Sequence, residues 1–131
     1  MQRDRDARFS YSVSPLAGSA VRIQLLGEVD LEVEDRVRAA LGEAADAAED
    51  SLVVDLSGLT FLDSTGLRLL IELRERLDGG SPVLSLVPGN ASVQRVFEVT
   101  GVDRSFNFMM AYGSKNEGPT QAPNTPVDAQ D

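Results

Sequence analysis

Residues 52–73 read LVVDLSGLTFLDSTGLRLLIEL. Residues 52–56 are almost continuously apolar and partly β-branched, which is typical of a central strand covered on both faces. Residues 67–73 place leucines at helical spacing, with Arg68 and Glu72 as charged neighbours. A buried strand that leads into an amphipathic helix is a building unit of α/β proteins. This stretch therefore predicts an α/β fold with residues 52–56 in the middle of the sheet.

The flanking regions continue the alternation of strands and helices. Alternating apolar residues predict strands over 9–13, 21–25 and 83–87. Helical spacing predicts helices over 33–48 and 93–97. The first two strands are expected to form an antiparallel hairpin with one wet face. Together the elements predict a single domain with a mixed sheet of about four to five strands and helices packed against it.

The two ends of the chain differ from its middle. Residues 1–7 alternate charges without apolar periodicity, so we expect a flexible lead-in. Residues 106–112 form a short apolar piece that is either an edge strand or a helical turn packed on the sheet. Residues 113–131 have hardly an apolar side chain to bury, which predicts a disordered tail. The domain is therefore expected to cover residues 8–112.

Composition narrows the range of partners. The chain has 131 residues, 42% of them hydrophobic, which is enough for one compact core. Its formal net charge of -9 argues against nucleic acid and against an anionic membrane surface, because binding either needs clustered positive charge. No stretch has the apolar length of a signal peptide or a membrane span, so we expect a soluble, cytoplasmic protein.

The chain contains neither cysteine nor histidine, which limits its chemistry. Thiolate nucleophiles, imidazole bases and most zinc or haem sites need one or the other. The sequence also lacks a Walker-type phosphate loop and a Gly-x-Gly-x-x-Gly turn. We therefore expect no catalytic residues, no cofactor and no metal, and we expect any nucleotide used to modify the chain to be bound by a partner.

Small polar residues, Asp63, Ser64 and Thr65, open the helix that follows the central strand. Such side chains accept hydrogen bonds from the free N–H groups of a first turn, so helix capping explains them structurally. The place also has functional meaning, because the crevice of an open α/β sheet lies outside the carboxyl ends of its strands. A helix N-terminus stabilises a negative group by about 0.3–1 kcal/mol, so a phosphate on Ser64 should leave the fold intact.

Several segments, taken in order, form a recognisable pattern. They are Gly27–Asp30, Leu52–Leu56, Phe61–Leu67 and Val93–Phe97 before Thr100-Gly101. In this order they resemble the STAS domain of bacterial anti-sigma factor antagonists. The resemblance covers residues 9–112, and Asp-Ser-Thr-Gly-Leu at the helix start is its most specific part.

The resemblance implies a partner-switching function. In that family the serine after the aspartate is phosphorylated by an anti-sigma factor that is itself an ATP-dependent serine kinase, and a serine phosphatase removes the phosphate. The unphosphorylated antagonist binds the anti-sigma factor and frees the sigma factor, while the phosphorylated antagonist dissociates from the anti-sigma factor. Carried onto this chain, Ser64 is the phosphate acceptor, and the chain itself is not an enzyme.

The same resemblance places the partner-binding residues around Ser64. We expect Asp63 to position the Ser64 hydroxyl or to cap the helix, and Asp30 to lie on the rim of the docking surface. Thr65 is a second hydroxyl and the less favoured phosphate acceptor. Gly66 would allow the backbone of a partner to approach closely, unless it is simply a glycine tolerated at a helix start.

Other functions compete with this one. A phosphoryl-accepting receiver domain would use Asp55, but it also needs a lysine, and the one lysine, Lys115, lies in the expected tail. We expect Asp55 to be a strand-end residue that bonds nearby N–H groups. An enzyme that uses Asp30, Asp55 and Asp63 as paired carboxylates or metal ligands has no further support in the sequence. A STAS scaffold or sensor module that phosphorylation does not regulate stays open.

Overall fold

The computed structural model describes residues 8–109, in which four strands form one mixed sheet. β1 (Phe9–Pro15) pairs antiparallel with β2 (Ala20–Val29), and β3 (Ser51–Leu62) lies parallel to β2. β4 (Val83–Val87) lies parallel to β3. The strand order is β1-β2-β3-β4, so the strand that contains residues 52–56 is an interior one. The predicted α/β fold, the hairpin and the mixed sheet are confirmed.

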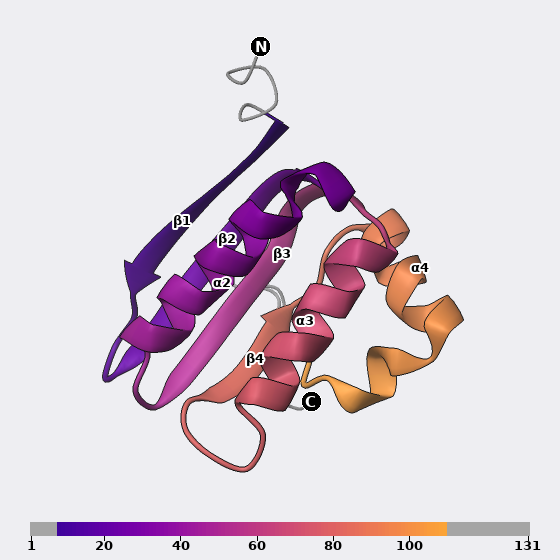
Figure 1. The fold of residues 1–131 in the computed structure, drawn as a ribbon. Helices are drawn as coiled ribbons and strands as arrows, with labels where there is room; N and C mark the ends of the chain where they lie inside the picture. Colours follow the sequence, from indigo (N-terminus) through magenta and orange to yellow (C-terminus); the bar gives the residue numbers. More distant parts are fainter. Residues whose placement is uncertain (1–7, 110–131) are drawn as a thin grey trace, which may run out of the picture.

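The helices connect the parallel strands and cover one face of the sheet. α2 (Glu34–Ala47) and α3 (Ser64–Arg76) are the crossovers, and α4 (Ala91–Thr100) follows β4. Short 3-10 turns, η1 (Leu31–Val33) and η2 (Val102–Ser105), precede α2 and follow α4. Figure 1 shows α2 and α3 side by side, both beginning at the same end of the sheet, with α4 on the far side of α3. No helix between residues 8 and 109 is long and apolar enough to cross a membrane.

The core lies between these helices and one face of the sheet. The strand register aligns Val13, Ile23, Val54 and Leu86 in one row across the sheet. Fully burying an apolar side chain of this size contributes about 1.5–3 kcal/mol to the free energy of unfolding, so the buried face of the sheet supplies much of the stability of the domain. The largest fully buried side chains are Phe9, Ile23, Leu25, Val29, Val37, Leu52, Val54, Leu56, Leu59, Leu70, Leu86 and Phe97.

β3 is longer than the sequence pattern predicts. The apolar run predicts a strand that ends at Leu56, whereas β3 continues to Leu62. β4 pairs with β3 only as far as Asp55, and beyond it β3 pairs with β2 after a shift in register. Ser57 and Thr60 are exposed there, so their polar side chains look like a loop in the sequence. Asp55 is therefore an interior strand residue, which corrects its expected place at the strand end.

The apolar piece after α4 contacts the outer side of β4. The Leu86 N–H donates to Asn107 O at 2.9 Å, and the Met109 N–H donates to Leu86 O at 2.8 Å. These bonds make an isolated parallel bridge between Leu86 and Phe108. This single bridge is nearer to the predicted edge strand than to the predicted helical turn, but residues 106–109 do not form a strand. The predictions of a flexible segment over 1–7, of an edge strand or helical turn over 110–112 and of a disordered tail over 113–131 concern residues outside the described range.

Candidate functional site

Helix α3 begins directly after β3, at the end of the sheet where the parallel strands have their carboxyl ends. Asp63 is its N-cap and has an extended backbone. The Asp63 Oδ1 accepts hydrogen bonds from the N–H of Thr65 at 2.9 Å and from the N–H of Gly66 at 3.2 Å. The capping role predicted for Asp63 is confirmed, and its carboxylate satisfies two of the free N–H groups of the first turn.

Ser64 is the first residue of α3 and its side chain is exposed. Within residues 8–109, no group hydrogen-bonds the Ser64 hydroxyl, since the bonds of the first turn go to Asp63 instead. Thr65, the second predicted hydroxyl, is half-buried. The Ser64 oxygen is therefore the more accessible of the two, and the helix does not need it as a cap.

Asp30 and Asp63 come together at this end of the sheet. Val29 and Leu62 are paired residues of β2 and β3, so the aspartates that follow them leave neighbouring strands. The Asp63 N–H also donates to Val29 O at 3.3 Å, which ties the two strand ends to each other. The Asp30 carboxylate caps η1 by accepting from the Glu32 N–H at 3.0 Å. A modification at Ser64 would thus add charge beside two existing carboxylates.

An arginine that no sequence pattern marks, Arg8, lies at the same end. Arg8 pairs with Glu28 at 3.4 Å, with Asp30 at 3.6 Å and with Glu32. Arg8 reaches these acids because β1 runs antiparallel to β2, with Phe9 opposite Gly27. That register cannot be read from residue spacing, so no local signal in the sequence points to Arg8.

Gly66 is buried, so its place differs from the surface position expected for a partner contact. A Cβ at Gly66 would lie 2.3 Å from Leu62 Cδ1 and 2.8 Å from Val29 Cγ1. Both neighbours are core residues, with 4% and 1% of their surfaces exposed. The requirement for glycine therefore comes from the close packing of α3 on the sheet.

Gly66→Ala should destabilise the domain by about 1 kcal/mol or more, because overpacking costs about 1–3 kcal/mol and the gain in helix propensity offsets only part of it. Gly42→Ala is the matched control in the middle of α2, where the nearest atom to the new Cβ is Arg76 Nη1 at 3.9 Å. Gly42→Ala should stabilise by about 0.5–1 kcal/mol. Chemical denaturation measures both, and a stabilising Gly66→Ala would contradict this account.

Asp55 lies away from this end, in the interior of β3, and it is 1% exposed. Its Oδ2 accepts from Arg22 Nη2 at 2.6 Å, and its Oδ1 accepts from the Ser57 N–H at 2.8 Å. The bonding to a nearby N–H is as predicted. Because Asp55 is not beside Asp30 and Asp63, the three do not form a joint carboxylate site, and the described part of the chain holds no group of acids placed to bind a metal.

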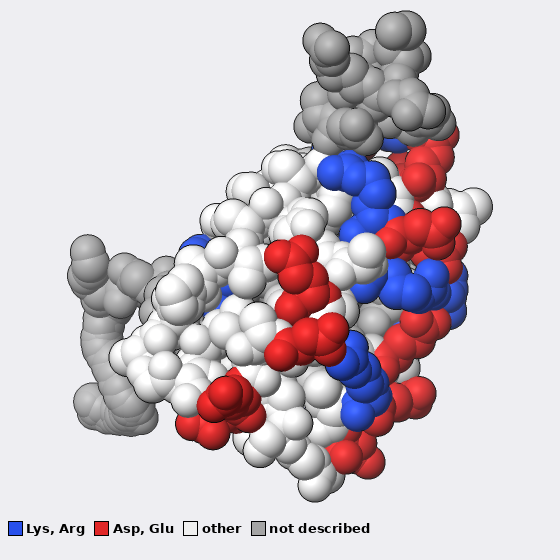
Figure 2. All heavy atoms as spheres, turned by 60° about the vertical axis from the view of Figure 1, so that its left-hand side comes forward, with Lys and Arg blue, Asp and Glu red and all other residues white. Residues whose placement is uncertain are grey.

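Charged side chains between α2 and α3 form a closed ring of alternating sign. Glu34 Oε2 accepts from Arg38 and from Arg68, each at 3.1 Å. Glu72 accepts from Arg38 through Oε1 and from Arg68 through Oε2, each at 3.3 Å. We call Glu34, Arg38, Arg68 and Glu72 the charge ring. Figure 2 likewise shows acidic and basic side chains interleaved along one side of the molecule, beside a largely uncharged surface.

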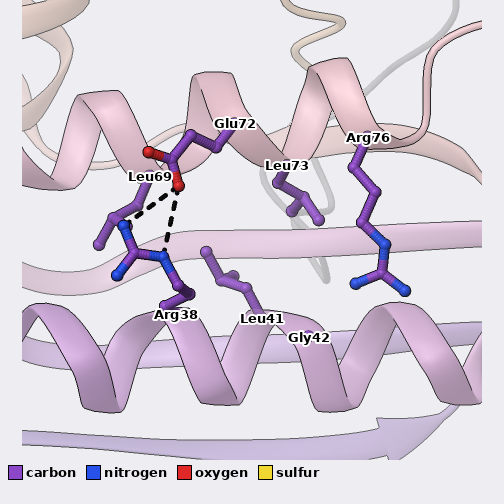
Figure 3. A pocket seen from close by; sticks show the side chains of 7 residues that line it. All are labelled: Arg38, Leu41, Gly42, Leu69, Glu72, Leu73 and Arg76. Carbon is purple, nitrogen blue, oxygen red and sulfur yellow. Dashed lines mark hydrogen bonds and ion pairs between the residues drawn. The ribbon is translucent and has the colours of Figure 1, made fainter.

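A hollow of about 220 Å³ lies next to the charge ring. Figure 3 shows Leu41, Leu69 and Leu73 between the two helices, with the Arg38–Glu72 pair at one end and Arg76 at the other. None of the residues predicted to bind a partner lines this hollow. The hollow is therefore separate from the exposed hydroxyl at the start of α3.

Comparison with known proteins gives consistent findings. Residues 14–111, well over half of the chain, match the family model described as "Mlab, STAS domain". The anti-sigma-F factor antagonist RsfB of Mycobacterium tuberculosis is 32% identical over 80 residues, which are 61% of this chain and 65% of that protein. The match thus spans slightly less than two thirds of the length of this relative.

Solved structures show the same fold. An anti-sigma factor antagonist from Mycobacterium paratuberculosis superimposes with a TM-score of 0.70 at 24% identity, over 82% of this chain and 87% of that one. The anti-sigma factor antagonist SpoIIAA in its unphosphorylated form gives 0.65 at 23% identity, over 79% and 90%. The Bacillus cell fate determinant SpoIIAA in the phosphorylated form gives 0.61 at 22% identity, over 79% and 93%.

Proposed function

The chain belongs to the STAS domain family, and from this premise we propose that it is an anti-sigma factor antagonist whose docking is switched off by phosphorylation of Ser64. In the unphosphorylated state it binds the anti-sigma factor and releases the sigma factor. The proposal draws support from the functions by which RsfB and the antagonists that share the fold are named.

The observation that carries the proposal is the exposed Ser64 hydroxyl at the first position of α3. Asp63 already caps the helix, so the hydroxyl can be modified without removing a hydrogen bond on which the first turn depends. The positive end of the helix dipole accepts a phosphate there. The modification therefore changes the surface and leaves the core as it is.

The effect on docking follows from charge and solvation. A phosphate adds about -1.5 to -2 charges and three acceptor oxygens. A partner surface that fits closely against a neutral hydroxyl would have to desolvate this group or move away, and burying an unpaired charge costs several kcal/mol. Asp30 and Asp63 lie at the same sheet end, so the phosphate also enlarges an existing negative charge.

The partners follow from the same proposal. The anti-sigma factor is the serine kinase and binds the ATP, and a serine phosphatase restores the hydroxyl. The antagonist itself has no catalytic role and needs no cofactor or metal, and its partners are proteins rather than nucleic acid or membrane. Its place of action is the cytoplasm, where sigma factors work. Asp30, Asp63, Ser64 and Thr65 form the docking surface, with Gly66 supporting it from below.

Phosphate transfer tests the proposal. The chain is incubated with its anti-sigma factor and Mg-ATP, and the modified residue is mapped by mass spectrometry. We expect a single phosphate on Ser64, which Ser64→Ala abolishes and Thr65→Ala retains. A phosphate on Thr65 alone would identify Thr65, and not Ser64, as the residue that switches docking. No phosphate on either hydroxyl, with the anti-sigma factor still bound, would favour the unregulated scaffold or sensor instead.

A further inference from the structure

Arg68 is the basic member of the charge ring on α3, one helical turn further along this helix than Ser64. Residues four apart on a helix lie on the same face with Cβ atoms about 5–6 Å apart. Helical side chains also lean toward the N-terminus of their helix, which here is the end occupied by Ser64. The long Arg68 side chain can therefore reach back toward a group added to the Ser64 oxygen.

The hydrogen bond from Arg68 to Glu34 keeps the Arg68 guanidinium at the end of the sheet where Ser64 lies. Glu34 is the first residue of α2, and Ser64 is the first residue of α3. Both helices begin at the same end of the sheet (Figure 1), so the 3.1 Å bond between Arg68 Nη2 and Glu34 Oε2 already holds the guanidinium at that end. The Arg68 side chain is 49% exposed, which leaves it free to change partners.

We propose that Arg68 is the intramolecular partner of the phosphate on Ser64, and that phosphorylation draws its guanidinium from Glu34 and opens the charge ring. The inference rests on the proposed function for the identity of the modified residue. Arg68 acts as a positioning residue, since it holds the phosphate on α3 and takes no part in the transfer.

The competition between the two acceptors favours the phosphate. Glu34 carries a single charge and already divides Oε2 between Arg38 and Arg68. A phosphoserine offers nearly twice the charge and three oxygens, and arginine binds phosphate through two parallel N–H groups. An acid that precedes a base by four residues is also the favourable order on a helix.

The exchange would alter more of the surface than Ser64 itself. The hydrogen bonds from Arg68 and Arg38 hold the pKa of Glu34 below its ordinary value, so this pKa should rise when Arg68 leaves. Arg38 and Glu72, the other members of the ring, line the hollow between α2 and α3 (Figure 3). Opening of the ring would therefore carry the signal of phosphorylation from the start of α3 to the space between the helices.

The test uses the full chain with phosphoserine incorporated at position 64 during synthesis, which requires no kinase. Phosphorus-31 NMR follows the second ionisation of the phosphate in the parent and in Arg68→Gln. We expect the pKa of the phosphate to be lower in the parent by roughly half a unit or more, because an opposite charge nearby favours the dianion and exposure limits the effect. Carbon-13 NMR should show the pKa of Glu34 rising on phosphorylation in the parent.

Arg76→Gln is the matched control, since it removes the same charge from the far end of α3, where Arg76 pairs with Asp46. Its phosphate pKa should equal that of the parent. Equal phosphate pKa values in the parent and Arg68→Gln, or an Arg76→Gln shift of the same size, would overturn the Arg68 contact. Either result would leave the partner switch standing, and a Ser64 that no kinase modifies would leave the contact standing.

Discussion

Ser64→Asp should bind the anti-sigma factor at least about 100-fold more weakly than the parent chain, whereas Ser64→Ala should bind about as tightly as the parent. Two unit charges about 4 Å apart near a protein surface interact by up to about 4 kcal/mol, and each 1.4 kcal/mol is tenfold in affinity. Desolvating the new carboxylate adds to the penalty. Ser64→Ala removes a hydroxyl that the first turn of α3 does not use.

Both variants should fold normally, because the side chain at position 64 is exposed and Asp63 remains the cap. Surface changes of this kind usually shift stability by less than about 0.5 kcal/mol, and an acid in a first turn is slightly favourable. Ser81→Asp adds the same charge to an exposed serine just before β4, at the opposite end of the sheet, and should bind like the parent. Equal losses of affinity in Ser64→Asp and Ser81→Asp would mean that the change in net charge, and not its place at Ser64, weakens binding.

Asp55→Asn should destabilise the domain by about 3 kcal/mol, which lowers Tm by roughly 12 °C or more in a domain of this size. The two side chains have nearly the same shape, so the loss comes from charge. The Asp55 side chain is 2% exposed and bonds Arg22 at 2.6 Å. Breaking a buried ion pair from one side leaves the other charge in a poorly solvated place.

Asp46→Asn is the matched control for burial. Asp46 also contacts an arginine, Arg76, at 2.6 Å, but its side chain is 74% exposed. Exposed pairs contribute less than about 1 kcal/mol, so Asp46→Asn should be nearly neutral. Equal losses in the two variants by chemical denaturation would contradict the role given to burial.

Asp55→Asn also distinguishes a receiver domain from an antagonist that is phosphorylated on Ser64. In a receiver domain the same substitution would remove the phosphoryl acceptor, whereas here it should lower stability and leave transfer to Ser64 intact below the melting temperature. The ion pair with Arg22 and the bonds from Ser57 occupy both oxygens of this carboxylate, which fits a structural role.

Local patterns predicted most of the fold. The apolar run 52–56 marked an interior strand, and the small polar residues after it marked the start of α3, because both signals lie within a few residues of chain. The rest of β3 was missed because only β2 pairs with that part, which leaves Ser57 and Thr60 exposed and gives this segment the polar look of a loop. How far β3 extends beyond its pairing with β4 depends on where β4 ends, and the spacing of apolar residues in β3 does not encode this.

The candidate site was predictable in its centre and less so around it. Ser64 and its capping neighbour Asp63 follow from the helix start, and the approach of Asp30 follows from the pairing of β2 with β3. Burial of Gly66 depends on how closely α3 packs on the sheet. The Arg68–Glu34 bond joins residues 34 positions apart, and only the placement of α2 beside α3 brings them together.

The central claim is that one exposed oxygen at the start of α3 decides docking through its charge. Calorimetric titration of the anti-sigma factor into the unmodified chain and into the chain carrying phosphoserine at position 64 tests it most directly, with the melting temperature of both recorded. The account predicts tight binding to the first chain, at least about 100-fold weaker binding to the second, and similar melting temperatures. Equal affinities of two equally folded chains would contradict it.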